Sequence, residues 1–248
     1  MSQIDYTHSE NVHTLEGPRV ALPIILESVK ANSLLDVGCG TGKATVLLAA
    51  KGLTGTALDG DPAMAGIASE NLANFPGWQV QVCDFEKWEP PPAAAPFDLI
   101  TCAQAWHWLD PDVRFHKANS LLRPGGWLAL WWNRAGALTK IGRGVQAIYD
   151  EIAPEIASKS WIARDPGRTS DAAPRGVAFS APIDKSYPWA KDYTADQWVA
   201  LIRTQSDHRL LQPERLEKLT ARVREFLLSQ GGTYRHAYVC RMSVMQKR

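Results

Sequence analysis

The sequence predicts an α/β fold built on a doubly wound, mostly parallel sheet. One reason is a series of short apolar runs of strand length that are separated by segments with helical spacing. Another is a glycine-rich turn, Gly38–Gly42, which follows the first of these runs. A third is that aspartates, Asp36 and Asp59, come directly after two of the runs. Strands that alternate with helices in this way are typical of parallel sheets with helices on both faces.

Strands and helices are expected to alternate from residue 18 to residue 132. Strands are expected in the run before Asp36 and at Gly55–Leu58, Trp78–Val82, Phe97–Thr101 and Trp127–Trp132. Helices are expected at Pro18–Lys30, Lys43–Lys51, from Pro62 onward and at about Pro111–Leu122. A proline in the first turn of a helix costs no hydrogen bond, and Asp61 before Pro62 can cap that helix. The turn Arg123–Gly126 is expected to lead into the fifth strand.

The pattern loosens between Asn133 and about Asp192, although Ile141–Ile152 keeps helical spacing. Residues Ala153–Ala181 mix proline, glycine, serine and charged residues, and so long a stretch in a compact domain is more often a lid than a passive connection. Regular elements are then expected again. They are a helix opened by a capping box at Thr194–Gln197 with Trp198, Leu201 and Ile202 inward, an amphipathic helix at Pro213–Leu228, and a strand at Tyr234–Met245.

The turn Gly38–Gly42 has the chemistry of a nucleotide site. Its glycines let a ligand approach the backbone, and the helix that follows presents unpaired N–H groups and the positive end of its dipole. Asp59 lies seventeen residues after Gly42, at the end of the next strand, where a carboxylate can bind the two hydroxyls of a ribose. Together these features predict a cofactor that contains a nucleoside.

The spacing of the glycines indicates which cofactor binds. Dinucleotide sites have the pattern G-x-G-x-x-G, whereas this turn reads Gly38-x-Gly40-x-Gly42 with Asp36 before it. A carboxylate so close to the turn would repel a pyrophosphate but would suit a cofactor with an ammonium group. NAD(P) remains the main alternative on this motif.

Residues Leu34–Gly42, LLDVGCGTG, resemble the first motif of the class I S-adenosylmethionine-dependent methyltransferases. Residues Ala103–Asp110, AQAWHWLD, resemble the motif after the fourth strand in the methyltransferase type 11 and trans-aconitate methyltransferase-like group, and Leu201–His208 is similar to that group as well. The resemblance implies a seven-stranded Rossmann-like sheet with an antiparallel last strand and a helical lid insertion. It further implies one domain over 1–248, with an N-terminal segment and helix (1–30), a cofactor-binding core (31–133), a lid or substrate-binding insertion (134–212) and a C-terminal helix and strand (213–248).

By the same resemblance, the turn after Asp36 holds the methionine half of the cofactor and Asp59 holds the ribose. Asp84 would accept a hydrogen bond from the adenine amine, and Phe85 would offer its backbone N–H to the ring. The full expected set of cofactor-binding residues is Asp36, Gly38, Cys39, Gly40, Gly42, Asp59, Gly60, Asp84, Phe85 and Ala103. For Asp84, an ordinary role as a helix cap or turn residue is the alternative.

Methyl transfer needs a base only where the acceptor must lose a proton. His107 is the candidate base and Gln104 the candidate orienting group, although both could instead hydrogen-bond within the fold. Candidate substrate-binding residues are Trp106, Trp108, Trp132, Asn133 and Tyr6. Aromatic side chains suit a planar or apolar acceptor, and core packing is the competing explanation for the tryptophans.

Charge and cysteine content narrow the class of protein. The chain has 27 Lys and Arg against 26 Asp and Glu, so no global field favours nucleic acid or an anionic membrane, and the basic residues near the C-terminus are expected on solvated faces. The four cysteines stand singly, which indicates a reducing compartment and neither a disulfide framework nor a metal site. No leader or membrane-spanning run is found, so a cytoplasmic protein is expected. A monomer or a homodimer is also expected.

The expected function is S-adenosylmethionine-dependent methylation of a small molecule, with O-methylation of an organic acid or hydroxyl favoured. N- or C-methylation of a natural-product intermediate is an alternative. Three other classes stay open: a non-catalytic cofactor-binding module, a nucleotide-dependent oxidoreductase, and an RNA methyltransferase, whose binding would depend steeply on salt.

Overall fold

The computed structural model describes residues 26, 29, 31–92, 94–157, 173–205 and 207–248. Contacts group the chain into two compact units. Of the described residues, those in 26–132, 173–186 and 241–248 form the sheet unit, and those in 133–157 and 187–240 form the helical unit. The division into one domain with a lid stays a prediction, and most of the helix expected at Pro18–Lys30 lies outside the described residues.

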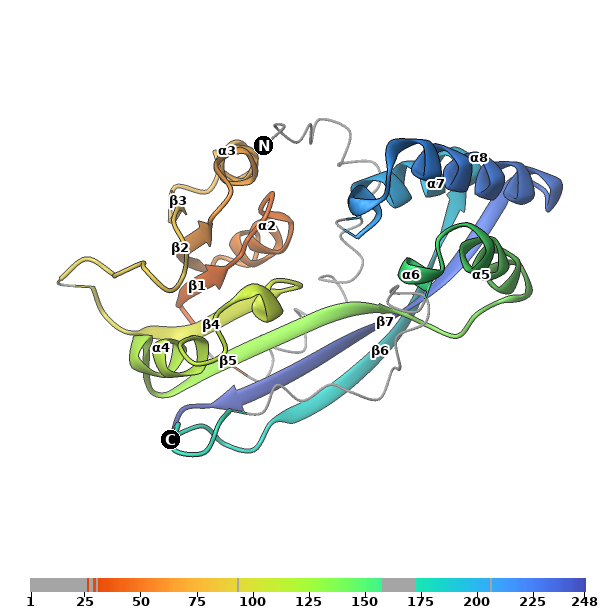
Figure 1. Cartoon of the computed structure of the whole chain (residues 1–248). Helices are drawn as coiled ribbons and strands as arrows, with labels where there is room; N and C mark the ends of the chain where they lie inside the picture. The colour runs from red at the N-terminus through yellow and green to blue at the C-terminus, as the bar shows by residue number, and fades with distance from the viewer. Residues whose placement is uncertain (1–25, 27–28, 30, 93, 158–172, 206) are drawn as a thin grey trace. The chain divides into compact units, whose positions relative to one another are not determined.

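Strands and helices alternate along the first part of the chain, as the apolar runs predict (Figure 1). In chain order the elements here are β1 (Ser33–Val37), α2 (Lys43–Ala49), β2 (Thr54–Asp59), α3 (Pro62–Asn71), β3 (Trp78–Val82), β4 (Phe97–Ala103), the 3-10 turn η2 (Trp106–Trp108), α4 (Arg114–Leu121) and β5 (Leu122–Ala135). The Asp61 carboxylate caps α3 as expected, accepting from the backbone N–H groups of Ala63 and Met64.

The remaining elements include one strand that the sequence pattern did not reveal. They are α5 (Lys140–Ile152), α6 (Pro154–Ala157), β6 (Ile183–Thr194), α7 (Ala195–Thr204), the 3-10 turn η3 (His208–Leu210), α8 (Pro213–Ser229) and β7 (Thr233–Gln246). Strand β6 was missed because it lies at the edge of the sheet, where Lys185, Pro188 and Lys191 replace a continuous apolar run. Charged residues and proline are common on edge strands, since they discourage pairing with other chains.

The seven strands form one sheet in the order β3-β2-β1-β4-β5-β7-β6. Strands β1 to β5 are parallel, and the order reverses between β1 and β4. Strand β7 runs antiparallel to β5, because Gly125 N–H donates to Lys247 O whereas Gly136 N–H donates to Ala237 O. The predicted doubly wound, Rossmann-like sheet with an antiparallel last strand is therefore confirmed.

The expected turn at Arg123–Gly126 is instead the beginning of β5, so the prediction of a strand starting at Trp127 was wrong. Lys247 donates its backbone N–H to Gly126 O and accepts from Gly125 N–H. This pairing with the end of the chain continues the β ladder through the two glycines. Gly125 has φ +74°, a conformation that glycine adopts without strain.

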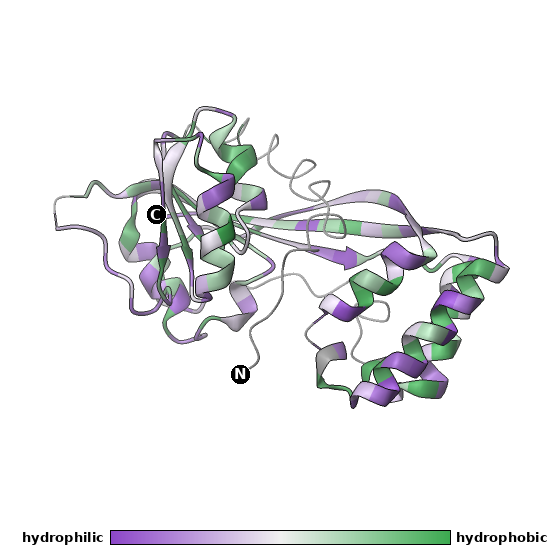
Figure 2. Ribbon diagram, turned by 90° about the horizontal axis from the view of Figure 1, so that it is seen from above, coloured by the Kyte–Doolittle hydropathy of each residue, from purple (hydrophilic) through white to green (hydrophobic). Residues whose placement is uncertain are grey.

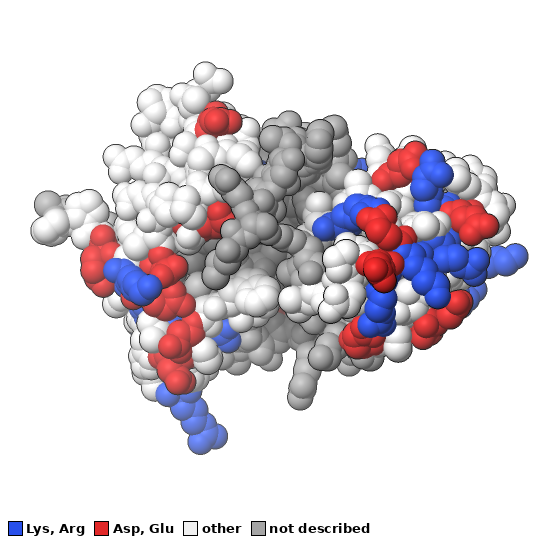
Figure 3. Space-filling view, turned by 45° about the horizontal axis from the view of Figure 1, so that its top comes forward, with Lys and Arg blue, Asp and Glu red and all other residues white. Residues whose placement is uncertain are grey.

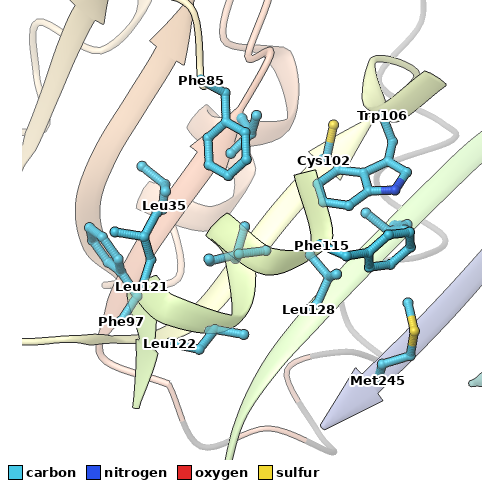
Figure 4. Close-up of a cluster of buried hydrophobic side chains, with 14 of the residues drawn as sticks. Leu35, Phe85, Phe97, Cys102, Trp106, Phe115, Leu121, Leu122, Leu128 and Met245 are labelled. Atoms are coloured by element: carbon cyan, nitrogen blue, oxygen red, sulfur yellow. The ribbon is translucent and has the colours of Figure 1, made fainter. Parts of the chain in front are cut away.

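The core of the sheet unit is an apolar cluster from β1, β4, β5 and α4 (Figure 4). Trp106 is fully buried in it and meets Phe115 edge-on, with ring centroids 5.2 Å apart. The helical unit has its own core beneath α5, α7 and α8, which carry hydrophobic and hydrophilic residues on different faces (Figure 2). The predicted capping box of Thr194 and Gln197 begins α7, and Trp198, Leu201 and Ile202 are buried as expected.

Candidate active site

The glycine turn joins β1 to α2 at the carboxyl end of the sheet, where ligands bind in folds of this type. Gly38, Gly40 and Gly42 have φ of +64°, +57° and +77°, so all three take the left-handed conformation that other residues adopt only with strain. A Cβ on Gly38 would lie 2.4 Å from that of Ala105, whereas one on Gly40 would meet no described atom within 4 Å. The turn is therefore packed tightly at its start and open above Gly40.

Asp36 lies beneath this turn and is only 1% exposed. Its two carboxylate oxygens accept hydrogen bonds from the hydroxyls of Thr45 on α2, at 2.5 Å, and Thr101 on β4, at 2.9 Å. Burial raises the pKa of Asp36 to about 6, although the two hydroxyls lower it in part. Asp36 thus ties β1, α2 and β4 together. Neither threonine was predicted, because nothing in the sequence indicates which hydroxyls meet a buried carboxylate.

Asp59 connects the glycine turn to the end of β2. One of its oxygens accepts from the backbone N–H of Gly40 at 2.7 Å, and the other accepts from that of Asp61 at 2.9 Å. The backbone N–H of Cys39 also donates to Leu58 O at 2.9 Å. A carboxylate has about four lone-pair positions, so Asp59 keeps acceptor capacity for a ligand.

The end of β3 lies against the end of β2. The backbone N–H of Cys83 donates to Asp59 O, and a Cβ on Gly60 would lie 2.9 Å from an Asp84 carboxylate oxygen. The Asp84 carboxylate is half exposed and pairs with the Lys87 ammonium at 2.6 Å. The structure therefore brings Gly60 and Asp84 together beside Asp59.

Phe85 is 2% exposed and its ring belongs to the apolar core, with its centroid 6.4 Å from that of Trp106. Ala103, the last residue of β4, is half-buried. The Cys39 thiol is largely enclosed, and its burial raises its pKa far above the usual range, so it stays protonated near neutrality.

The segment after β4 carries the candidate catalytic residues. Gln104 is exposed and has φ +62°, which is rare for any residue except glycine, and its N–H donates to Trp131 O at 3.0 Å. His107 and Trp108 are exposed side by side, with ring centroids 5.0 Å apart, and Trp108 is 72% exposed. Trp106, by contrast, is enclosed by protein, so contact with a substrate would require its neighbours to move.

Two other expected substrate-binding residues, Trp132 and Asn133, follow Trp131 on β5. Trp132 is 5% exposed and packs in the core of the sheet unit. Asn133 belongs to the helical unit, where its side-chain oxygen accepts from the indole N–H of Trp189 at 3.3 Å. Tyr6 lies outside the described residues.

The helical unit contains a buried polar cluster that the sequence did not reveal. The His208 ring bonds the Tyr149 hydroxyl through Nε2 and the Asp207 carboxylate through Nδ1, both at 2.7 Å. Tyr149 and His208 are fully buried. His208 belongs to the segment Leu201–His208 noted above, but its partner Tyr149 lies on α5, far away in the chain.

Other features bear on metals, membranes and charge. Among the described residues, no group of three or more His, Cys, Asp or Glu is placed to hold a metal ion, and no helix has the length and apolar character needed to cross a bilayer. All four cysteines are free thiols. Charged side chains of both signs alternate over the helical unit (Figure 3), where Arg203 pairs with Glu217 and Arg224 with Asp196.

Comparison with known proteins agrees with this geometry. A family model described as a methyltransferase domain matches residues 34–126, which include β1 to β4 and the glycine turn. This part of the chain is similar to methyltransferase domains. The uncharacterized methyltransferase Rv3342 of Mycobacterium tuberculosis is 36% identical over 116 residues, which span 45% of this chain and 46% of the relative.

Two further similarities are to an enzyme and to a solved structure. The trans-aconitate 2-methyltransferase of Delftia acidovorans is 30% identical over 124 residues, or 48% of this chain and 45% of that enzyme. The chain thus matches about half the length of these curated relatives. The structure of the YcgJ protein from Bacillus subtilis shares the fold with a TM-score of 0.55 at 15% identity, covering 93% of this chain and 99% of that chain.

Proposed function

We propose that the protein uses S-adenosylmethionine to methylate a small molecule, with O-methylation of an organic acid or hydroxyl favoured. The observation that carries this proposal is the bond from Gly40 N–H to Asp59, which joins the glycine turn to the predicted ribose-binding residue at the carboxyl end of the sheet. Asp84 follows from the neighbouring strand, beside Gly60. The glycine turn, the predicted ribose-binding Asp59 and the predicted adenine-binding Asp84 follow the order of the methionine, ribose and adenine parts of the cofactor.

The residues present fit this cofactor. Among the described residues no atom would meet a Cβ on Gly40, which leaves room against the backbone, and the start of α2 supplies N–H groups there. Asp59 would accept from the ribose hydroxyls and Asp84 from the adenine amine. Asp36 is too deeply buried for broad contact, so we propose that it supports the methionine side through the turn and through its charge.

S-adenosylmethionine supplies a methyl group that is already activated on a sulfonium. The protein must then hold the acceptor in line with that group and exclude water. A carboxylic acid acceptor is ionised at neutral pH and needs no base, whereas a hydroxyl acceptor must lose a proton. In the second case His107 would take that proton, and in both cases Gln104 would orient the acceptor.

A small organic acid is the favoured acceptor because the curated relatives include a trans-aconitate 2-methyltransferase. The exposed pair His107 and Trp108, on the segment after β4, offers an acceptor a polar and an aromatic contact. The balance of acidic and basic residues also favours a small molecule over nucleic acid. N- or C-methylation of a natural-product intermediate is the second candidate, and a non-catalytic cofactor-binding module is the third.

Calorimetry with S-adenosylmethionine and S-adenosylhomocysteine tests cofactor binding. We expect micromolar affinity for the wild type and at least tenfold weaker binding for Asp59→Ala, or about 1.4 kcal/mol. The matched control is Asp112→Ala, which removes the same charge from an exposed position before α4 and should bind normally. If the wild type does not bind, the proposed cofactor is wrong.

Mass spectrometry then tests the acceptor, with small di- and tricarboxylic acids, alcohols and amines as separate sets. A methyl ester is lost in mild alkali, whereas a methyl ether, an N-methyl or a C-methyl group is retained, so loss of the methyl group identifies methylation of a carboxylic acid. We expect an alkali-labile product from an acid. Binding without any methylated product across the three sets would favour the non-catalytic module.

A further inference from the structure

Two loops at the carboxyl end of the sheet are joined by side chains. We call residues 83–89, after β3, the β3 loop and residues 104–110, after β4, the β4 loop. The Glu86 carboxylate of the β3 loop accepts from the backbone N–H of Asp110, at the end of the β4 loop, at 2.8 Å. The Lys117 ammonium on α4 donates to Glu86 O at 2.9 Å and to the Glu89 carboxylate at 3.1 Å. Lys117 therefore fixes the backbone of Glu86, and the Glu86 side chain in turn fixes the backbone of Asp110.

The same two loops also meet in the core, one residue before Glu86. The rings of Phe85 and Trp106 are in contact, and the Lys117 ammonium lies 5.9 Å from the Phe85 ring centroid. On the other side, the Arg114 guanidinium donates to Trp106 O at 2.7 Å and lies over the Trp106 ring. The middle of the β4 loop is thus fixed to α4, while its far end is fixed to the β3 loop.

The first residue of the β4 loop is strained. Gln104 is the one residue other than glycine with positive φ in the described part of the chain. Such a conformation is energetically costly and persists where surrounding contacts impose it. Its own N–H bond to Trp131 and the two attachments further along, at Trp106 and Asp110, are contacts of this kind. A change at one attachment would therefore alter the stability of the whole β4 loop.

We propose that Glu86 is a positioning residue that couples the cofactor site to the β4 loop. The inference rests on the proposed function, in which adenine contacts Asp84 and Phe85, the two residues before Glu86. A ligand that fixes these residues also fixes Glu86, and the Glu86 carboxylate then holds Asp110 and the segment with His107 and Trp108. By linkage, an acceptor that orders the β4 loop binds more tightly when the cofactor is bound, by the same factor in each direction.

Hydrogen exchange of the full chain, with and without S-adenosylhomocysteine, measures this coupling peptide by peptide. In the wild type we expect the ligand to slow exchange in residues 36–42, in the β3 loop and in the β4 loop. In Glu86→Met, which keeps the length of the side chain and removes its acceptors, the first two segments should keep their protection and the β4 loop should lose it. Glu86→Gln retains an oxygen that can accept from Asp110 N–H, and it should restore the protection.

Glu89→Met is the matched control, because among the described residues Glu89 bonds Lys117 and makes no hydrogen bond to the β4 loop. It should behave as the wild type does. Ligand-dependent protection of the β4 loop that is unchanged in Glu86→Met would overturn the proposal, as would protection of 36–42 and the β3 loop alone in the wild type. An absence of binding by calorimetry and of protection in all three segments would overturn the proposed cofactor, and the coupling with it.

Discussion

Replacing Asp36 by asparagine tests whether the acid beneath the glycine turn is as perturbed as its surroundings indicate. The substitution preserves the shape of a side chain that is 1% exposed, and it removes the charge. It also turns one of the two acceptor groups for Thr45 and Thr101 into a donor, so one hydroxyl must rotate. That cost does not depend on pH, whereas the cost of burying a carboxylate does.

The size of the effect follows from the pKa. Burial raises the pKa of Asp36 from 3.8 to about 6, so the folded protein binds a proton here that the unfolded chain has released. The contribution of Asp36 to stability is therefore fully present below pH 3.8 and is lost as the pH rises through about 6. The difference corresponds to about 3 kcal/mol, at about 1.4 kcal/mol for each pKa unit.

Urea unfolding of the wild type and Asp36→Asn over a series of pH values measures this loss. The free energy of unfolding of the wild type, minus that of the variant, should fall by about 3 kcal/mol as the pH rises from below 4 to above 6.5. A constant difference between wild type and Asp36→Asn at every pH would refute the reasoning, because the hydroxyls would then compensate fully for burial.

Two other substitutions probe packing at the turn and in the helical unit. Gly38→Ala should abolish cofactor binding and reduce the melting temperature, because its Cβ would lie 2.4 Å from that of Ala105 and its backbone is left-handed. Gly52→Ala is the control: Gly52 has φ +82° and no described atom lies within 4 Å of its added Cβ, so this variant should show only the cost of the left-handed backbone. Tyr149→Phe should destabilise the protein by about 1–3 kcal/mol in urea unfolding, because it leaves Nε2 of the buried His208 without its partner; an unchanged midpoint would contradict this expectation.

The sequence predicted most of the sheet because strand ends and turns have local signals. Trp78–Val82 was predicted with the bounds that the structure has, and the Asp61 cap and the Thr194 capping box were both correct. The signals fail where a strand depends on a partner far away in the chain. Strand β5 continues back through Gly125 because Lys247 pairs with it, and no local pattern reveals that pairing.

In the candidate site, too, residues with a local sequence signal could be predicted, whereas residues that act through distant contacts could not. Asp59 and the glycine turn are recognisable because their chemistry is tied to fixed spacing, and the structure brings them together. Trp106 was a candidate for substrate binding with core packing as the alternative, and it is buried in the core of the sheet unit. Thr101 and Glu86 act through contacts with residues distant in the sequence, so only the folded chain could identify them.

The way the strands are shared between the two units has a consequence for inheritance and for engineering. Strand β5 belongs to the sheet unit up to Trp132 and to the helical unit from Asn133, and β7 passes the other way between Cys240 and Arg241. Neither unit is one continuous stretch of the gene. A fragment that ends at Trp132 would lack β7, the strand that pairs with β5. Because the helical unit is also discontinuous in the sequence, it cannot be exchanged between relatives as a single segment. Recombination would have to replace it together with its crossing strands, at junctions matched in register within β5, β6 and β7.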